Sequence, residues 1–261
     1  MPLMPGAEPF FHAGGRVGVL LCHGFTGTPQ SLRPWAEHLA AAGLTVRLPR
    51  LPGHGTTWQE LNMTRWQDWY AAVERALIDL RSRCDAVFVA GLSMGGSLAL
   101  RLAQQHPLAV AGLILVNPAV HSEDPARHLL PMVRHVVATL PGVAFDIKKP
   151  GAVEVAYDRT PLHAAYSLTR LWALIRRDLA AVTQPLLVLH SRVDHIVAPS
   201  NTVRVLAGVS SRDVTDIELA DSFHVATLDN DAPRIFAETL AFVRRLTATA
   251  ASGGESGHRP G

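Results

Sequence analysis

Cysteine and long apolar runs are scarce in this chain of 261 residues. The two cysteines, Cys22 and Cys84, form neither a CxxC pair nor a disulfide framework, which fits a reducing compartment. No apolar run reaches the roughly 18 residues of a membrane-spanning helix. The first residues also lack the basic and apolar regions of a signal peptide. These absences argue against a disulfide-stapled or membrane-spanning protein, and we expect a cytoplasmic one.

Net charge and metal-binding motifs are also lacking. The formal net charge is only +2, which is too small to indicate a nucleic-acid partner. The 13 histidines show no HxxxH-type pairing with carboxylates, and no glycine-rich phosphate loop occurs. We therefore expect no nucleic-acid partner, no metal and no other cofactor. The oligomeric state does not follow from the sequence.

The chain contains 48% hydrophobic and 18% charged residues, which is enough to form the hydrophobic core of one large domain. Short apolar runs alternate with amphipathic helical stretches, which predicts an α/β fold with a mostly parallel sheet and helices on both of its faces. The expected strands are residues 17–22, 44–48, 86–90, 111–116, 185–190 and 214–219. One helix is expected directly after Thr28. Four further helices are expected at residues 66–80, 94–105, 201–206 and 233–246.

This alternation stops between residues 119 and 182, where helical pieces occur without a good strand. We therefore expect a body formed by residues 1–118 and 183–247, interrupted by a small helical cap at residues 119–182. Residues 248–261 are small, polar and rich in glycine, and this composition predicts a disordered tail.

The strongest local signal is the stretch Gly91-Leu92-Ser93-Met94-Gly95, which fits G-x-S-x-G. An apolar strand precedes it and a helix follows it, which predicts a tight elbow that forces Ser93 into a strained backbone conformation and needs small neighbours. The helix N-terminus also favours negative charge at this serine. The alternative is a turn that merely joins strand to helix. The context favours a nucleophilic serine.

A serine hydroxyl is a weak nucleophile and needs a positioned base. In chains with this elbow, the partners follow in the order Ser, then Asp or Glu, then His. Asp194 and His224 keep this order, and each follows a predicted strand, at the edge where open α/β sheets place their sites. The competing candidates are His195, which adjoins Asp194, and Asp221, which is near His224.

Acyl transfer also needs donors aimed at the developing oxyanion. The residue after the nucleophile, Met94, offers its backbone N–H. The second donor is expected in the loop His23-Gly24-Phe25-Thr26-Gly27, after the strand 17–22, and the N–H of Phe25 is our candidate. His23 is interpreted as a structural hydrogen-bonding residue rather than as a second base.

With these residues in place, the sequence resembles the bacterial monoacylglycerol lipases and related small carboxylesterases, which are α/β-hydrolases. The resemblance runs from about Val19 to about Leu246 and rests on HGFTGTP, LPRLPGHGT, GLSMGG, VEVAYDRTP and HVATLD. It implies an α/β-hydrolase fold with a helical cap. It also implies cofactor-free cleavage of the ester of a single fatty acyl chain through an acyl-enzyme. The cap segment PARHLLPMVRHVVATLPGVAF departs from a typical member.

The resemblance also assigns roles to residues. Ser93, Asp194 and His224 match the family's catalytic triad, and Phe25 and Met94 match its oxyanion residues. Glu154 in VEVAYDRTP matches a cap carboxylate that faces the polar glycerol head. Val143, in an apolar loop of the cap, is expected to line the acyl channel. The alternative for Glu154 and Val143 is a solvated carboxylate and an ordinary cap loop.

Two other functions fit the same motifs. A perhydrolase or a thioesterase would use the same triad and elbow. A binding protein on a hydrolase scaffold would usually lose a triad member, and this chain keeps all three. The leading interpretation is a serine hydrolase acting on small ester or lipid substrates, most of all monoacylglycerols.

The cap also carries residues suited to lipid. Its apolar side chains fit an acyl chain or pack the cap onto the body, and its arginines fit a transient contact with an anionic membrane surface or a solvated basic face. The apolar residues are Leu129, Leu130, Met132, Val133, Val136, Val137 and Leu140; the arginines are Arg127, Arg134, Arg176 and Arg177.

Overall fold

The computed structural model describes residues 2–142 and 145–253. A seven-stranded sheet lies at its centre, with the strand order β1-β3-β2-β4-β5-β8-β9. Neighbouring strands pair in parallel except β1, which pairs antiparallel with β3 at one edge. The strands are β1 Phe10–His12, β2 Val17–Cys22, β3 Thr45–Leu48, β4 Ala86–Leu92, β5 Gly112–Val116, β8 Leu186–Ser191 and β9 Val214–Leu219. The expected α/β fold with a mostly parallel sheet is confirmed.

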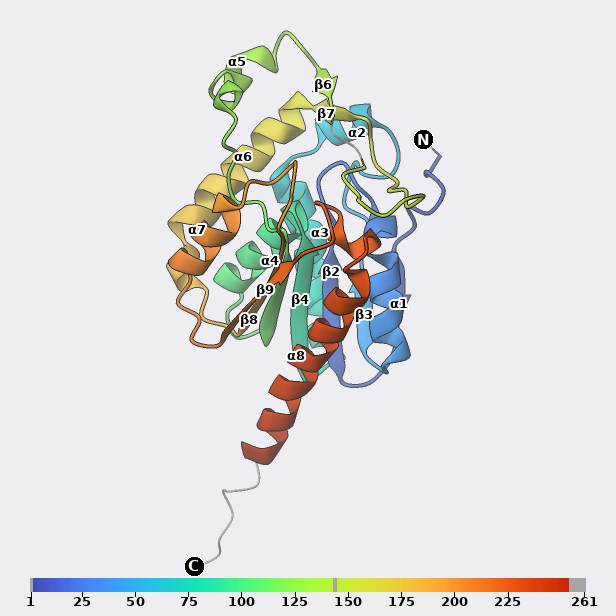
Figure 1. Cartoon of the computed structure of the whole chain (residues 1–261), viewed down its shortest axis with the longest axis vertical. Helices are drawn as coiled ribbons and strands as arrows, with labels where there is room; N and C mark the ends of the chain where they lie inside the picture. Colours follow the sequence, from blue (N-terminus) through green and yellow to red (C-terminus); the bar gives the residue numbers. More distant parts are fainter. Residues whose placement is uncertain (1, 143–144, 254–261) are drawn as a thin grey trace, which may run out of the picture.

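Helices cover both faces of this sheet (Figure 1). One apolar cluster joins the sheet to α1 and α8, and the other joins it to α3, α4 and α6. Alternate residues of β2 enter opposite clusters, since successive side chains of a strand point to opposite faces. The helices of the body are α1 Arg33–Ala41, α2 Trp58–Met63, α3 Trp66–Arg81, α4 Met94–Gln105, α7 Ser200–Gly208 and α8 Ala232–Gly253, with the 3-10 helices η1 Pro29–Leu32 and η4 Ala226–Leu228. In the described part of the chain, none of the helices combines the length and apolarity needed to cross a bilayer.

The segment between β5 and β8, which we call the cap, reaches the upper end of the molecule (Figure 1). It contains a two-stranded antiparallel sheet that the sequence did not indicate, because strands of three residues are too short to show a periodicity. Its elements are η2 Pro125–His128, α5 Leu130–Val133, β6 Thr139–Pro141, β7 Arg159–Pro161, α6 Leu162–Arg177 and η3 Leu179–Ala181.

The structure differs from the sequence prediction at two helix ends. The helix expected after Thr28 begins as the 3-10 turn η1, and α-helical geometry starts only at Arg33. Helix α8 continues to Gly253, so residues 248–253 of the expected tail are helical. Residues 254–261 lie outside the described residues.

Both cysteines are buried and free. Cys22 ends β2, and Cys84 lies just before β4. Burial raises the pKa of each thiol above its ordinary value, because the thiolate loses hydration in the apolar interior.

Candidate active site

Ser93 occupies a strained turn between β4 and α4, with φ +56°. Two neighbouring glycines make this turn possible. A Cβ atom on Gly91 would lie 2.2 Å from the carbonyl carbon of Gly95, and one on Gly95 would lie 1.8 Å from the carbonyl oxygen of Cys22. Met94 is the first residue of α4, so its N–H has no acceptor within the helix. The elbow predicted from the sequence is therefore present, and any side chain at either glycine would break it.

The side chains of Asp194 and His224 meet at the ends of β8 and β9. Nδ1 of His224 lies 2.7 Å from Oδ2 of Asp194, and these side chains are only 9% and 4% exposed. The other carboxylate oxygen of Asp194 accepts the N–H groups of Ile196 at 2.9 Å and Val197 at 2.7 Å. With Nδ1–H donating to Asp194, Nε2 of the neutral ring is left as an acceptor.

Burial alone would raise the pKa of Asp194. The hydrogen bond and charge of His224, together with the two backbone N–H donors, more than offset this effect and hold the pKa below its ordinary value. Asp194 is therefore a carboxylate at neutral pH, as an orienting acid must be.

The competing candidates make other contacts, although His195 also lines the two cavities beside Ser93. Asp221 forms a 2.6 Å ion pair with Lys148, and its side chain is 59% exposed. The ring of His195 contacts Asp146 through Nδ1 at 2.7 Å and is 54% exposed. Of the acids considered from the sequence, Asp194 is the one that contacts the ring of His224.

Two cavities meet at Ser93. The first, about 260 Å³, is lined by Ser93 and His224 together with Phe25 and Glu154. The second, about 350 Å³, is lined by Ser93, Asp194, Phe25 and Met94. The structure thus brings together six of the seven residues singled out in the sequence. The seventh, Val143, lies outside the described residues.

The loop after β2 approaches the elbow closely. A Cβ atom on Gly24 would lie 3.7 Å from Cβ of Ser93, so the loop runs beside the serine. Phe25 follows, and its ring packs against Trp69 at 5.7 Å between ring centroids. A packed Phe25 ring is compatible with a backbone N–H that faces the site.

His23 in the same loop has a structural role. Its Nε2 accepts the N–H of Leu51 at 3.1 Å, and its Nδ1 lies 3.0 Å from the carbonyl oxygen of Gly24. Burial lowers the pKa of His23 to about 4, so the ring is neutral and joins two loops. This arrangement agrees with its interpretation as a structural hydrogen-bonding residue.

Glu154 faces the cavity of Ser93 and His224. Among the described residues, no donor lies within hydrogen-bonding distance of its carboxylate. Burial raises the pKa of Glu154 to about 7, although the nearby His224 acts in the opposite direction. A Cβ atom on Gly27 would lie 2.8 Å from Oε1 of Glu154, so Gly27 leaves the room that this carboxylate fills. A partly buried carboxylate that faces a cavity without a hydrogen-bonding partner among the described residues is typical of a group that binds a ligand.

Asn117 supports the site and was missed in the sequence. It follows β5 with φ +44°, and its Oδ1 accepts the N–H of Ser191 at 2.7 Å. Its Nδ2 donates to the carbonyl oxygen of His224 at 2.8 Å. Asn117 and His224 are 107 positions apart, and no local sequence pattern predicts a contact over such a separation. Asn117 thereby ties the ends of β5 and β8 to the loop that carries His224.

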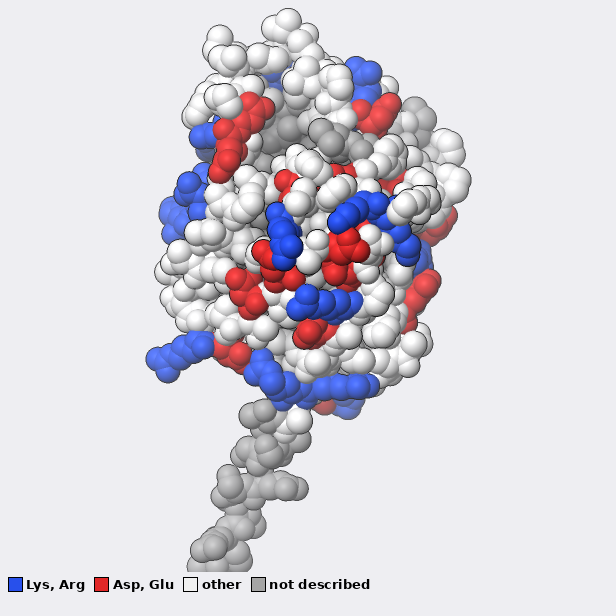
Figure 2. Space-filling view, viewed as in Figure 1, with Lys and Arg blue, Asp and Glu red and all other residues white. Residues whose placement is uncertain are grey.

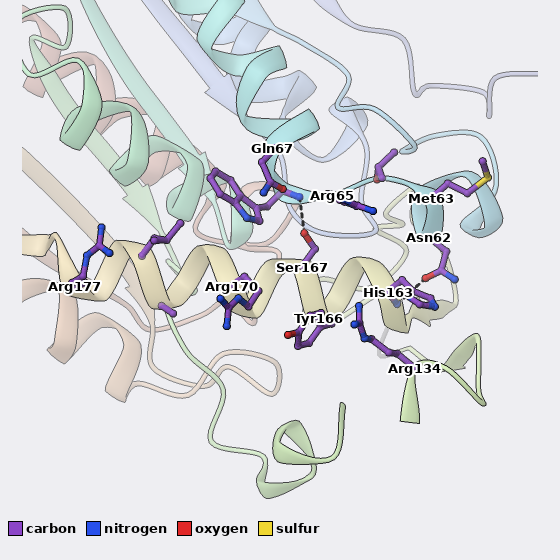
Figure 3. Close-up of a pocket in the computed structure, with 14 residues that line it drawn as sticks. Asn62, Met63, Arg65, Gln67, Arg134, His163, Tyr166, Ser167, Arg170 and Arg177 are labelled. Carbon is purple, nitrogen blue, oxygen red and sulfur yellow. Dashed lines mark hydrogen bonds between the residues drawn. The ribbon is translucent and has the colours of Figure 1, made fainter. Parts of the chain in front are cut away.

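A further cavity, of about 1060 Å³, lies apart from this site. It runs along α6 and the segment between α2 and α3, and the arginines Arg65, Arg134, Arg170 and Arg177 line it (Figure 3). Its lining includes neither Ser93 nor His224. The hydroxyl of Ser167 in its lining accepts the N–H of Trp66 at 2.8 Å. Within residues 2–142 and 145–253, no cluster of three histidine, cysteine or acidic side chains is placed to hold a metal ion.

Comparisons with known proteins agree with this geometry. The sequence model of the family described as serine aminopeptidase, S33, matches residues 15–231. The chain is 43% identical to a thermostable monoacylglycerol lipase from a Bacillus species, over 92% of this chain and 96% of that one. It is 27% identical to a carboxylesterase from Bacillus subtilis, over 92% and 97% of the two chains. A solved structure from work on the metagenome-derived lipolytic enzymes LipS and LipT superposes with a TM-score of 0.91. It is 43% identical and covers 94% of this chain and all of that one.

Proposed function

Because this chain belongs to the serine aminopeptidase S33 family of α/β-hydrolases, we propose that it hydrolyses carboxylic esters, above all monoacylglycerols, with Ser93 as its nucleophile. The observation that carries the proposal is the 2.7 Å contact between His224 and Asp194 beside a cavity that Ser93 also lines. Two of the compared relatives are a monoacylglycerol lipase and a carboxylesterase, which supports the substrate class.

In the proposed reaction, Oγ of Ser93 attacks the ester carbonyl carbon while Nε2 of His224 takes the hydroxyl proton. The N–H groups of Phe25 and Met94 stabilise the negative charge that develops on the carbonyl oxygen. His224 then gives its proton to the departing alcohol, which leaves an acyl-enzyme on Ser93. A water molecule, deprotonated by His224, releases the fatty acid and restores the serine. Asp194 holds the imidazole in the required tautomer throughout.

We assign the glycerol head to Glu154 and the acyl chain to the cap loop. The carboxylate of Glu154 has no donor among the described residues, and a diol supplies two hydroxyl donors. Gly142 and Phe145, on either side of residues 143–144, line the same cavity. We therefore keep Val143 as our proposed contact for the acyl chain.

Replacing Glu154 by alanine is expected to lower kcat/KM for a monoacylglycerol by about 10-fold, which corresponds to about 1.4 kcal/mol, the scale of one hydrogen bond to a charged group. The p-nitrophenyl ester of the same fatty acid has no diol, so its hydrolysis should change by less than about 2-fold. Steady-state kinetics on the two substrates give the ratio of kcat/KM for the monoacylglycerol to kcat/KM for the p-nitrophenyl ester. A uniform loss on both substrates would contradict the assignment.

The same carboxylate predicts a pH dependence. Because the pKa of Glu154 is about 7, the group is neutral below that pH and an anion above it. An anion accepts hydrogen bonds from hydroxyls more strongly, so the preference for monoacylglycerol over the p-nitrophenyl ester should rise as pH increases through about 7. Because the preference is a ratio measured at each pH, titration of groups that affect both esters alike cancels. In the Glu154→Gln variant the ratio should be flat, and a persistent slope would assign the titration to another group.

We also propose a cytoplasmic enzyme whose cap makes transient contact with membrane surfaces. Apolar side chains of the cap lie exposed, including Met132 at 73% and Val136 at 88%. The upper end of the molecule, where the cap lies, carries few charged residues in Figure 2. Arg134, with its guanidinium 4.0 Å from the ring of Tyr166, adds a positive charge nearby. Co-sedimentation with anionic vesicles, compared between the parent protein and a Met132→Ser, Val136→Ser variant, tests this contact.

A further inference from the structure

The carboxylate of Asp146 lies where the cap returns to the body, and its side chain is only 8% exposed. Oδ2 accepts the backbone N–H of His224 at 3.1 Å and that of His195 at 3.1 Å, while Oδ1 lies 2.7 Å from Nδ1 of His195. The carbonyl oxygen of Asp146 accepts the N–H of Val225 at 3.0 Å. A single cap residue thus binds two consecutive backbone N–H groups of the loop that carries His224.

These contacts join three segments that are distant in the sequence. Asp146 is 49 positions from His195 and 78 from His224. His195 directly follows Asp194, so the carboxylate holds the loop after β8 and the loop after β9 against each other. These are the two loops whose side chains form the contact between Asp194 and His224. Without Asp146, the N–H groups of His195 and His224 would lose their carboxylate acceptor, and the N–H of His224 lies in a partly buried place.

A second buried carboxylate offers a comparison within the same chain. Asp229 is 1% exposed and accepts the N–H groups of Lys148 at 2.7 Å, Lys149 at 2.9 Å and Phe223 at 2.9 Å. It therefore fastens the same cap segment to the same loop after β9. The contact of Asp229 with this loop is at Phe223, one residue before His224. Asp146 and Asp229 thus make similar links between the cap and the body, but only Asp146 contacts the backbone of His224.

We propose that Asp146 is a positioning residue that fixes His224 relative to Asp194 and Ser93, and so makes the alignment of the triad depend on the seating of the cap. The inference rests on the role proposed above for His224. Its physical basis is that a base displaced by about 1 Å from its productive position can lose about 10²-fold in rate, even when the substrate still binds. The effect of Asp146 should therefore fall on kcat rather than on KM.

The test compares Asp146→Ala with Asp229→Asn on one p-nitrophenyl ester. Asp146→Ala is expected to lower kcat by about 10- to 10²-fold, with KM within about 3-fold of the parent value. Asp229→Asn is expected to lower the melting temperature at least as much but to leave kcat within about 3-fold. If kcat falls equally in both variants, or falls only in proportion to the melting temperature, Asp146 is a structural link and the proposal is wrong.

Two further measurements keep the test decisive. If Asp146→Ala does not fold, Asp146→Asn keeps the side-chain volume and one acceptor oxygen, and it should show an intermediate loss of kcat. The low-field proton resonance of Nδ1–H in His224 should shift or broaden in the Asp146 variants and persist in Asp229→Asn. Labelling of the parent protein by a fluorophosphonate separates the two claims. Absence of label on Ser93 would refute the proposed function, whereas label with an unchanged kcat in Asp146→Ala would refute only the role of Asp146.

Discussion

Replacing Ser93 by alanine is expected to lower kcat/KM for esters by about 10⁴-fold or more while leaving the protein folded. The substitution removes only Oγ, and alanine tolerates the positive φ of this position no worse than serine does. The residual rate should come from the oxyanion donors and from substrate binding. Ester kinetics, circular dichroism and covalent labelling with a fluorophosphonate measure the three consequences.

Ser97 offers a matched control on the same helix. Its hydroxyl is buried, donates to the carbonyl oxygen of Ala119 and accepts from Nε1 of Trp172 at 3.2 Å, so it is committed to structure. The Ser97→Ala variant should be less stable than the parent but should still be labelled fully at Ser93. Labelling of the Ser93→Ala variant at any other serine would mean that the nucleophile has been assigned wrongly.

Asp194→Asn is expected to have the second-largest effect, a loss of about 10⁴-fold in kcat, since an amide in this place favours the wrong imidazole tautomer. The two oxygens of Asp194 bind His224 and the N–H groups of Ile196 and Val197, and asparagine keeps only one acceptor. Because the pKa of Asp194 is held below its ordinary value, the stabilisation from its charge is complete at neutral pH. That stabilisation is lost only as the pH falls through the lowered value.

Asp221→Asn provides the comparison for this variant. Asp221 pairs with Lys148 on the surface, so its replacement should change kcat by less than about 3-fold. Steady-state kinetics at neutral pH on one ester compare kcat of the two variants. A larger loss at Asp221 than at Asp194 would contradict the order Ser, Asp, His that we read along the chain.

The parts of the fold that follow from the sequence are those with a local signal. A parallel strand that is covered on both faces must be apolar throughout, so it is visible in the sequence as an apolar run. The buried strands Val17–Cys22 and Gly112–Val116 therefore lie within one residue of their expected limits. The elbow at Ser93 could be predicted because a tight strand-to-helix turn demands glycine at positions 91 and 95. Asp194 and His224 could be paired from their places after two strands, since parallel strands bring such places to one edge.

The remaining features depend on contacts between distant residues. Edge strand β1, residues Phe10–His12, is too short for a periodicity and exists because it pairs with β3. Asp146 belongs to no local motif, and only the fold brings it to the N–H of His224. The start of α1 illustrates a different reason. Thr28 has the residue type of a helix cap, yet its side chain makes no capping hydrogen bond, and the first turn is a 3-10 helix.

The burial of Cys22 and Cys84 has a practical consequence. With thiols that are shielded from solvent and whose pKa values are raised, the native enzyme should resist alkylation by iodoacetamide at neutral pH. A cysteine introduced at an exposed cap position such as Met132 should then react selectively, without removal of the two native thiols. A spin label or a fluorophore attached there would report the mobility and the solvent exposure of the cap in solution. A change in the signal of this label during turnover would indicate movement of the cap.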